Sequence, residues 1–253
     1  MHNIYYMKLI PQILLETNDF LVINKPSGLL VHPDGKREEY SLVDWILENY
    51  PEIKEVGESL MVEYKGEIKT IYRPGIVHRL DRETSGVMII VKNQEMYEHL
   101  KQQFQNHIIR KQYLAFVQGW SNDRGIISEP IGRNGNDIRK WATGKHTRGV
   151  KRDAVTRYVT QKKFLDSDQN KFSLVQLFPE TGRTHQLRVH MKTIQHAIIG
   201  DGLYAPNTIG NLDFHRVALH AEKLSFMDLN NQEQEIIAPV PADFQKIIDK
   251  LEM

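Results

Sequence analysis

Short apolar segments separated by turn-forming residues recur along most of this 253-residue chain, and they constrain its fold more than any other feature. Segments of this kind, rich in branched and aromatic residues, are typical of β-strands. Strands are expected on both sides of Asn18-Asp19 within residues 13–33, and at residues 86–92, 111–119, 172–178 and 216–226.

Helices are expected only in a few intervals between these strands. They are a short helix opened by a capping box at Ser41 and continuing through Tyr50, a helix capped by Asn93, and helices at residues 184–196 and 243–251. Strands and helices do not alternate in regular βαβ units. The sequence therefore predicts an α+β fold with a mixed, largely antiparallel central sheet flanked by helices.

Length and composition narrow the class of protein. The length fits one large domain or two small ones, and we expect a single domain over residues 1–253. The absence of cysteine excludes a disulfide framework, a thiolate metal site and a thiol nucleophile, and it favours the cytoplasm. No signal peptide pattern is present, and no segment approaches the roughly 18 to 20 apolar residues of a membrane span. We therefore expect a cytoplasmic protein with no membrane partner.

Positive charge is concentrated in one stretch. Residues 139–163 contain nine lysines and arginines against the single acid Asp153, whereas the whole chain has a net charge of only +1. Clustered basic residues replace the counterions of a polyanion such as RNA, although a solvated charged face has the same composition. The stretch predicts a phosphate-binding surface.

The segment HRLDRETSG, residues 78–86, concentrates reactive side chains just before an apolar run. Asp81 lies between Arg79 and Arg82, and nearby cations favour an ionised carboxylate, which can act as a nucleophile or a base. The same pattern also fits a surface ion pair, and His78 with Asp81 could instead bind a metal. Carboxylate chemistry and a solvated charged loop both remain open at this segment.

A second polar segment, PETGRTHQLRVHM at residues 179–191, crosses from a strand into a helix. Thr184 and Arg188 are four residues apart, and Arg188 lies beside an apolar stripe that contains Leu187 and Met191. Its guanidinium could hold a carboxylate through two parallel hydrogen bonds, or it could simply extend from the core to water.

Two further features have ordinary structural explanations. His185 and His190 are five residues apart, which places them on different sides of a helix, so we expect no metal site. Tyr113 lies on a strand beside Arg110 and Lys111, where a tyrosine most often packs against neighbouring strands.

Taken together, these segments resemble the RluA-type pseudouridine synthases. The most specific motif of that family, HRLD followed two residues later by TSG, is complete. The matching segments are ETNDFLVINKPSGLLVHP at residues 16–33, HRLDRETSG at 78–86, KQYLAFVQG at 111–119, TGRTHQLRVH at 181–190, and Ile199-Gly200-Asp201 with Tyr204. They follow one another in order from about residue 12 to about residue 226, which is most of the chain.

The resemblance implies the pseudouridine synthase catalytic fold and the isomerisation of uridine in RNA without metal or cofactor. Asp81 is then the catalytic aspartate, Tyr113 the aromatic residue that stacks on the target base, and Arg188 the basic partner of Asp81. Arg79 is expected to take the place of the flipped nucleotide. The other residues expected to bind RNA are His78, Arg82, Thr84, Arg183, His185, Arg139, Lys140, Lys151 and Arg152.

The resemblance also implies which molecules this protein binds. The expected partner is structured ribosomal or transfer RNA, bound by a monomer without an obligatory protein partner. The catalytic pattern begins at about residue 12, so we expect no amino-terminal S4-type RNA-binding module, which many relatives carry. Met227-Asp228 departs from the His-Pro expected there.

Two alternatives remain open: a catalytically silent RNA-binding assembly factor of the same fold, and a metal-dependent hydrolase that uses His78, Asp81, His185 and His190.

Overall fold

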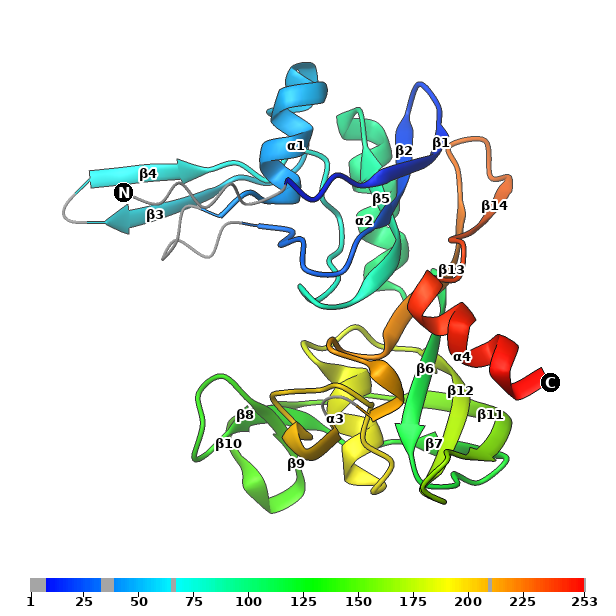
Figure 1. The fold of residues 1–253 in the computed structure, drawn as a ribbon. Helices are drawn as coiled ribbons and strands as arrows, with labels where there is room; N and C mark the ends of the chain where they lie inside the picture. Colours follow the sequence, from blue (N-terminus) through cyan, green and yellow to red (C-terminus); the bar gives the residue numbers. More distant parts are fainter. Residues whose placement is uncertain (1–7, 33–38, 65–66, 209–210, 253) are drawn as a thin grey trace, which may run out of the picture. The chain divides into compact units, whose positions relative to one another are not determined.

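The computed structural model describes residues 8–32, 39–64, 67–208 and 211–252, so Pro33 of the opening motif lies outside the described residues. The chain divides into two compact units (Figure 1). Unit 1 comprises Met1–Asn106 and Phe226–Ala238, and unit 2 comprises His107–Ser225 and Pro239–Met253. Both units combine antiparallel strands with helices, and the predicted α+β fold is confirmed. The single domain expected over the whole chain stays a prediction.

Unit 1 is built on the antiparallel strands β1, β2 and β5, with β2 in the middle. A separate hairpin joins β3 to β4. The elements of unit 1 are β1 (Gln12–Glu16), β2 (Phe20–Lys25), α1 (Leu42–Asn49), the short 3-10 helix η1 (Pro51–Ile53), β3 (Leu60–Tyr64), β4 (Glu67–Ile71), β5 (Ser85–Val91), α2 (Gln94–Gln105) and β14 (Glu233–Ile237).

Local sequence signals account for the main elements of unit 1. All seven residues of β5 are buried, as the uninterrupted apolar run predicts. The capping box is present at α1: the Ser41 hydroxyl accepts the Asp44 N–H, and the Asp44 carboxylate accepts the Ser41 N–H at 2.8 Å. The Asn93 side chain accepts the Met96 N–H at 2.9 Å and caps α2.

Unit 2 contains a five-stranded antiparallel sheet in the order β13-β6-β12-β11-β7 and a second sheet in the order β10-β8-β9. β13 begins in unit 2 and ends in unit 1. The elements are β6 (Arg110–Gln118), β7 (Arg124–Ile127), β8 (Ile131–Asn134), β9 (Trp141–Thr143), η2 (Gly144–His146), β10 (Thr147–Arg152), β11 (Thr156–Leu165), β12 (Lys171–Pro179), α3 (Gln186–Thr193), η3 (Pro206–Thr208), η4 (Asn211–Asp213), β13 (Leu219–Met227) and α4 (Ala242–Glu252).

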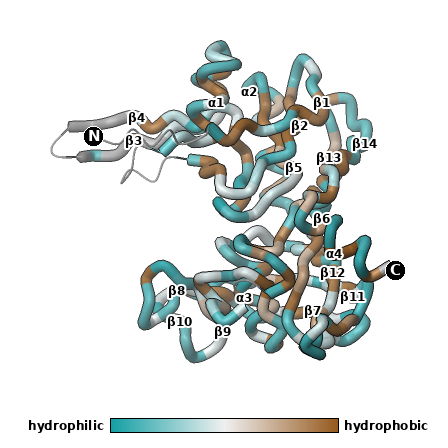
Figure 2. The backbone as a smooth tube through the Cα atoms, viewed as in Figure 1, coloured by the Kyte–Doolittle hydropathy of each residue, from teal (hydrophilic) through white to brown (hydrophobic). Residues whose placement is uncertain are grey.

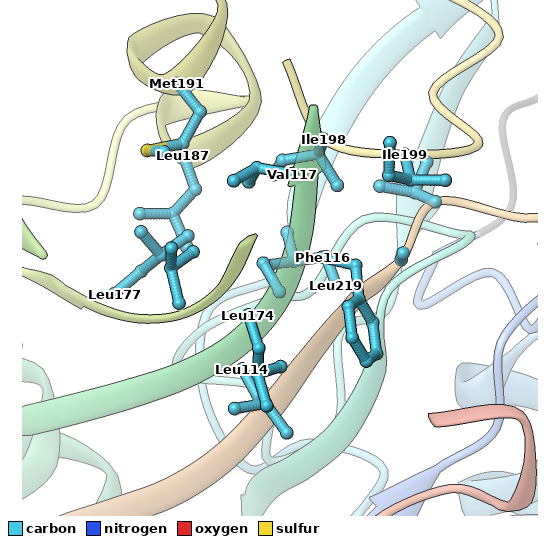
Figure 3. Packing of buried hydrophobic residues seen from close by; sticks show 14 of the residues in the cluster. Leu114, Phe116, Val117, Leu174, Leu177, Leu187, Met191, Ile198, Ile199 and Leu219 are labelled. Atoms are coloured by element: carbon cyan, nitrogen blue, oxygen red, sulfur yellow. The ribbon is translucent and has the colours of Figure 1, made fainter. Parts of the chain in front are cut away.

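The core of unit 2 forms where α3 and the following loop cover β6 and β12 (Figure 3). Phe116 of β6 is fully buried, and its ring centroid lies 5.2 Å from that of Phe244 in α4. Leu187 and Met191 of the predicted apolar stripe are buried, and Ile194 is partly buried against the same cluster. The apolar face of α3 thus fixes the helix on the sheet.

Three expectations about unit 2 need correction. The helix predicted at residues 184–196 is shorter, because His185 adopts a left-handed backbone conformation with φ of +56° and caps α3. Thr184 therefore precedes the helix and shares no helical face with Arg188. The late strand begins at Leu219 rather than at Arg216, whose guanidinium instead pairs with Asp243. β11 was not predicted, because its alternating buried Thr156 and Tyr158 lie within the basic stretch.

The β8-β9-β10 sheet differs from the core strands in composition. Figure 2 shows mainly hydrophilic residues along it. A small apolar cluster of Ile131, Ala154, Val189 and Tyr204 packs β8 against α3 within unit 2. Among the described residues, no helix has the length and apolar character that crossing a membrane requires.

Gly75 offers a test of the packing in unit 1. Its φ is +64°, and a Cβ at this position would lie 2.2 Å from the carbonyl oxygen of Val91, so Gly75→Ala meets both a left-handed backbone and a backbone clash. Gly144 is the matched control, with φ of +60° and no atom within 4 Å of the same position. We expect Gly144→Ala to lower the free energy of unfolding by about 1–2 kcal/mol and Gly75→Ala to lower it by clearly more, measured by urea denaturation. Equal losses would show that the backbone around Val91 moves aside freely.

Candidate active site

Asp81 begins a tight turn that leads directly into β5. The Thr84 N–H donates to the Asp81 carbonyl at 3.2 Å and closes the turn over residues 81–84, a position at which aspartate is favoured. Thr84 is buried, Asp81 is half-buried, and Arg82 is exposed. The carboxylate is therefore carried by a turn that leads into a strand whose every residue is buried.

A second loop, residues 26–29, holds this turn in place through backbone atoms. The Gly28 N–H donates to the Arg82 carbonyl at 2.8 Å, and the Ser27 hydroxyl donates to the Glu83 carbonyl at 2.7 Å. In return, Arg82 Nε donates to the Gly28 carbonyl at 3.1 Å. Bonds in both directions limit how far the turn can move relative to β2, which precedes the loop.

Lys25, the last residue of β2, connects the loop and the turn from inside. Its side chain is completely buried, and Nζ donates to the carbonyls of Pro26 and Leu29, each at 2.9 Å, and to that of Arg82 at 3.1 Å. An ammonium group has three N–H donors, and three carbonyl oxygens receive them here. Sequence reasoning gave this lysine no role, because its acceptor at Arg82 is 57 residues away.

The other charged residues of HRLDRETSG have distinct surroundings. Arg82 Nη1 lies 3.0 Å from Glu39 Oε2, so Glu39 is an ion-pair partner of Arg82. The His78 ring stacks on Phe104 with centroids 4.9 Å apart, and its Nε2 accepts the Ile89 N–H at 3.0 Å. These contacts join His78 and Arg82 to other residues of unit 1. Arg79, between them, is exposed. The expected RNA contacts of His78, Arg79, Arg82 and Thr84 stay predictions.

Arg188 is buried on α3 and held by a carboxylate. Its Nε and Nη2 donate to the two oxygens of Asp201 at 2.7 and 2.8 Å, and its guanidinium lies 5.1 Å from the centre of the Tyr204 ring. Asp201 also accepts the N–H groups of Leu203 and Tyr204, at 3.1 and 2.9 Å. The bidentate geometry that the sequence allowed is thus present with Asp201, and the pairing of Arg188 with Asp81 stays a prediction.

Tyr204 links Arg188 to its neighbours in unit 2. The Tyr204 hydroxyl accepts the Trp141 N–H of β9 at 2.9 Å and lies 2.8 Å from His185 Nδ1. The cap of α3, strand β9 and the Asp201 loop therefore meet at one phenol. A left-handed backbone at His185 is costly for a residue with a side chain, and these contacts help to hold it.

Tyr113 lies on β6, between β12 and β13, where it pairs with Leu177 on β12 and Ala221 on β13. It is only partly buried. Lys111 precedes it by two residues on β6 and so faces the same side of the sheet. Burial lowers the pKa of Lys111 to about 8, and its Nζ would lie 3.9 Å from a Cβ on Gly182. Nothing in the residues around Lys111 indicates this lowered pKa, because it depends on burial in the folded chain.

The predicted basic stretch has two parts in the structure. Some members have acidic or carbonyl partners: Arg139 and Lys140 with Asp137, Arg157 with Glu180, Lys163 with Asp123, and Lys162 with the Leu251 carbonyl. On β10, by contrast, Arg148, Lys151 and Arg152 are exposed and have no ion pair among the described residues. Arg183, near α3, donates to the Asp153 carbonyl at 2.9 Å.

The histidines of the metal hypothesis are engaged in other bonds. The two ring nitrogens of His190 lie 2.9 Å from Thr156 Oγ1 and 3.0 Å from the Glu129 carbonyl, and burial lowers the pKa of the ring. Over the described part of the chain, no group of three or more histidine, cysteine or acidic residues is arranged to hold a metal.

The Arg188–Asp201 pair gives a stability prediction. Asp201→Asn keeps the shape of the side chain but leaves Arg188 buried without its countercharge, so we expect the free energy of unfolding to fall by about 3–5 kcal/mol. Asp213→Asn, which breaks the exposed pair with Lys246 in the same unit, is the control and should have little effect. Chemical denaturation of both variants measures the difference. Equal losses would contradict a special cost for the buried guanidinium.

Comparison with known proteins places these features in one family. The family model for RNA pseudouridylate synthases matches residues 19–193. An uncharacterised RNA pseudouridine synthase of Bacillus subtilis, YlyB, is 37% identical over 241 residues, which cover 94% of this chain and 72% of that protein. The ribosomal large subunit pseudouridine synthase D of Zymomonas mobilis is 32% identical over 95% of this chain and 72% of its own length.

A solved structure has the same fold. It is that of human RNA pseudouridylate synthase domain containing 1, with a TM-score of 0.71 and 26% sequence identity over 92% of this chain and 84% of the human chain. The family match, the identity to bacterial relatives and the shared fold agree with the resemblance carried by the sequence motifs. The chain belongs to the RNA pseudouridine synthase family and is an RNA-modifying isomerase.

Proposed function

We propose that this enzyme isomerises specific uridines in structured RNA, with ribosomal RNA as the first candidate substrate and Asp81 as the catalytic carboxylate. The isomerisation breaks the bond between N1 of uracil and C1′ of the ribose, turns the base and joins C5 to C1′. Every atom of the base is retained, except that the proton on C5 leaves and N1 gains one. The reaction therefore needs a group that assists at the sugar and a group that manages protons.

The observation that supports Asp81 most strongly is its setting in unit 1. The turn over residues 81–84 is tied to the loop at residues 26–29 by backbone bonds and by the buried Lys25, yet the carboxylate itself is only half-buried. A reactive group that is rigidly held and still reachable meets the general requirement of a preorganised site. The complete HRLD and TSG motif supports the same assignment.

Tyr113 and Arg188 are proposed for the roles that the family motifs suggest. A flipped base needs a flat stacking partner, and Tyr113 is a partly exposed aromatic residue on a central strand. Arg188 supplies a positive charge fixed in direction by two bonds to Asp201, and a fixed charge can stabilise an anion without reorganising. In this proposal the anion is the Asp81 carboxylate.

The exposed basic residues of β10 are proposed to bind RNA phosphates, and the exposed Arg79 of unit 1 is proposed to take the place of the flipped nucleotide. Two of the relatives with about one third identity are named ribosomal large subunit pseudouridine synthase D, which supports ribosomal RNA over transfer RNA as the substrate. Cytoplasmic location, monomeric state and action without an obligatory protein partner stay predictions.

Replacing the proposed catalytic carboxylate tests the function directly. Asp81→Asn removes the charge with almost no change of shape, so RNA affinity should stay close to that of the wild type while turnover falls by at least about a hundredfold. Pseudouridines can be mapped by carbodiimide-dependent reverse-transcription stops in cells that lack the gene and are rescued with either form. A site restored by wild type alone identifies substrate and aspartate together. A site that Asp81→Asn also restores rules out the assignment. If no site is affected, the activity of purified protein on total RNA distinguishes a redundant synthase acting on the same uridine from the catalytically silent alternative.

Lys25 gives a second prediction, because it is proposed to position the Asp81 turn. Lys25→Met removes three bonds to buried carbonyls, so we expect a loss of about 1–3 kcal/mol in the free energy of unfolding and a lower kcat with little change in KM. The control is Lys92→Met, at the other end of β5, whose Nζ bonds Glu16 and the Thr17 carbonyl. This variant should lose some stability but keep the kcat of the folded enzyme. Wild-type kcat in Lys25→Met would show that the lysine only stabilises unit 1.

A further inference from the structure

Lys111 is a partly buried lysine of unit 2 that the chemistry described above does not use. It lies on β6, and burial is the one cause that lowers its pKa to about 8. Acids on the adjoining segments bond other groups: Glu180 pairs with Arg157, and Glu222 accepts a hydrogen bond from Gln112 at 2.8 Å. Within the described part of the chain, no opposite charge therefore offsets the desolvation of this ammonium group.

Strand geometry places Lys111 next to Tyr113 on one face of β6. The pairing with β13 contains a bulge, because Ala221 pairs with Tyr113 whereas Lys223 pairs with Gln112. The extra residue belongs to β13, so β6 keeps its regular alternation. Residues two apart on a strand share a face, and their Cα atoms lie about 6.7 Å apart. The ammonium group is therefore carried one side-chain spacing from the phenol that is proposed to stack on the target base.

The space beside the Lys111 ammonium group is open. The pairing of β6 with β12 ends at Tyr113 and Leu177, and beyond Pro179 the chain enters a loop that contains the exposed Gly182. A Cβ on Gly182 would meet Lys111 Nζ at 3.9 Å and, apart from the residues on either side of the glycine, no other described atom within 4 Å. A ligand can therefore approach the ammonium group over a backbone that carries no side chain.

An anion from the RNA would complete this arrangement. A desolvated charge without a partner lowers the stability of the folded protein, and such a cost persists where a ligand supplies the missing charge. Lysine binds phosphate as a compact point charge. RNA presents a phosphate at every nucleotide, so a base that stacks on Tyr113 brings its own phosphates to the neighbourhood of Lys111.

We propose that Lys111, beside the exposed Gly182, binds the phosphate group that adjoins the flipped target nucleotide. The proposal rests on the proposed function in one respect, namely that Tyr113 receives the flipped base. It adds a contact at the target nucleotide itself, whereas the basic residues of β10 are proposed to bind the RNA backbone in general. A phosphate held by Lys111 would fix how far the flipped nucleotide extends over the Tyr113 ring.

The first test measures RNA binding by the full-length protein. The probe is labelled large-subunit ribosomal RNA from cells that lack the gene. At pH 7, Lys111→Met should weaken binding by about tenfold and reduce the slope of log affinity against log salt by about 0.7–0.9. Lys111→Arg keeps the charge and should keep the wild-type affinity and slope. Melting curves of both variants check that each remains folded.

The second test uses the pH dependence of the same binding. Lys111 is charged below its pKa of about 8, and a bound phosphate favours this charged form. Raising the pH from 7 to 8.5 should therefore lower the RNA affinity of the wild type by about threefold. Lys111→Arg remains charged at both pH values and should show no such loss. Because both proteins bind the same RNA, titration of the RNA itself cancels in the comparison.

The control is Lys171→Met, at the start of β12, where the exposed ammonium lies 4.6 Å from the centre of the Trp120 ring. It should leave affinity, salt slope and pH profile unchanged. Unchanged affinity in Lys111→Met overturns the proposal, even if kcat falls, because the charge would then act on the reacting base. A Lys111→Arg variant as weak as Lys111→Met overturns it as well. These readouts are affinities, so failure of the proposed function, read from the activity of Asp81→Asn, is distinguished from failure of the phosphate contact.

Discussion

The buried pair of Arg188 and Asp201 is the interaction on which the arrangement of unit 2 depends. Either charge alone would be too costly inside the protein, so the helix that carries Arg188 and the loop that carries Asp201 have to be placed together. Through Tyr204, the same pair also determines the position of β9 and the cap of α3. Arg188 is therefore held in one orientation by residues of the protein itself.

Three buried or partly buried cations of this chain are treated in three different ways. Arg188 has a carboxylate, Lys25 has three backbone carbonyls, and Arg73 leaves a nitrogen without any partner among the described residues. The first two solutions are self-contained and give rigidity to a helix and to a turn. The third leaves one buried N–H group unsatisfied within the described residues, which lowers the stability gained by burying that side chain.

Local signals in the sequence predicted much of this fold. The apolar run of β5, the capping box at Ser41 and the cap at Asn93 each depend on residues within a few positions of one another. The start of α3 could not be predicted in this way, because the left-handed His185 is held by Tyr204, 19 residues later. β11 was missed because burial of alternate residues against β12 overrides its charged composition.

The candidate site shows the same division between local and distant effects. Asp81 and Arg188 could be identified because each belongs to a recognisable sequence motif. The residues that hold these segments could not be identified in this way: Lys25 bonds Arg82, 57 residues away, and Asp201 bonds Arg188, 13 residues away. Lys25 also works through main-chain oxygens, which every amino acid possesses. The side chains at Pro26, Leu29 and Arg82 can therefore change in evolution without loss of the bonds to Lys25. Lys25 itself cannot be replaced in the same way, because no other side chain ends a chain of this length in three N–H donors on one nitrogen.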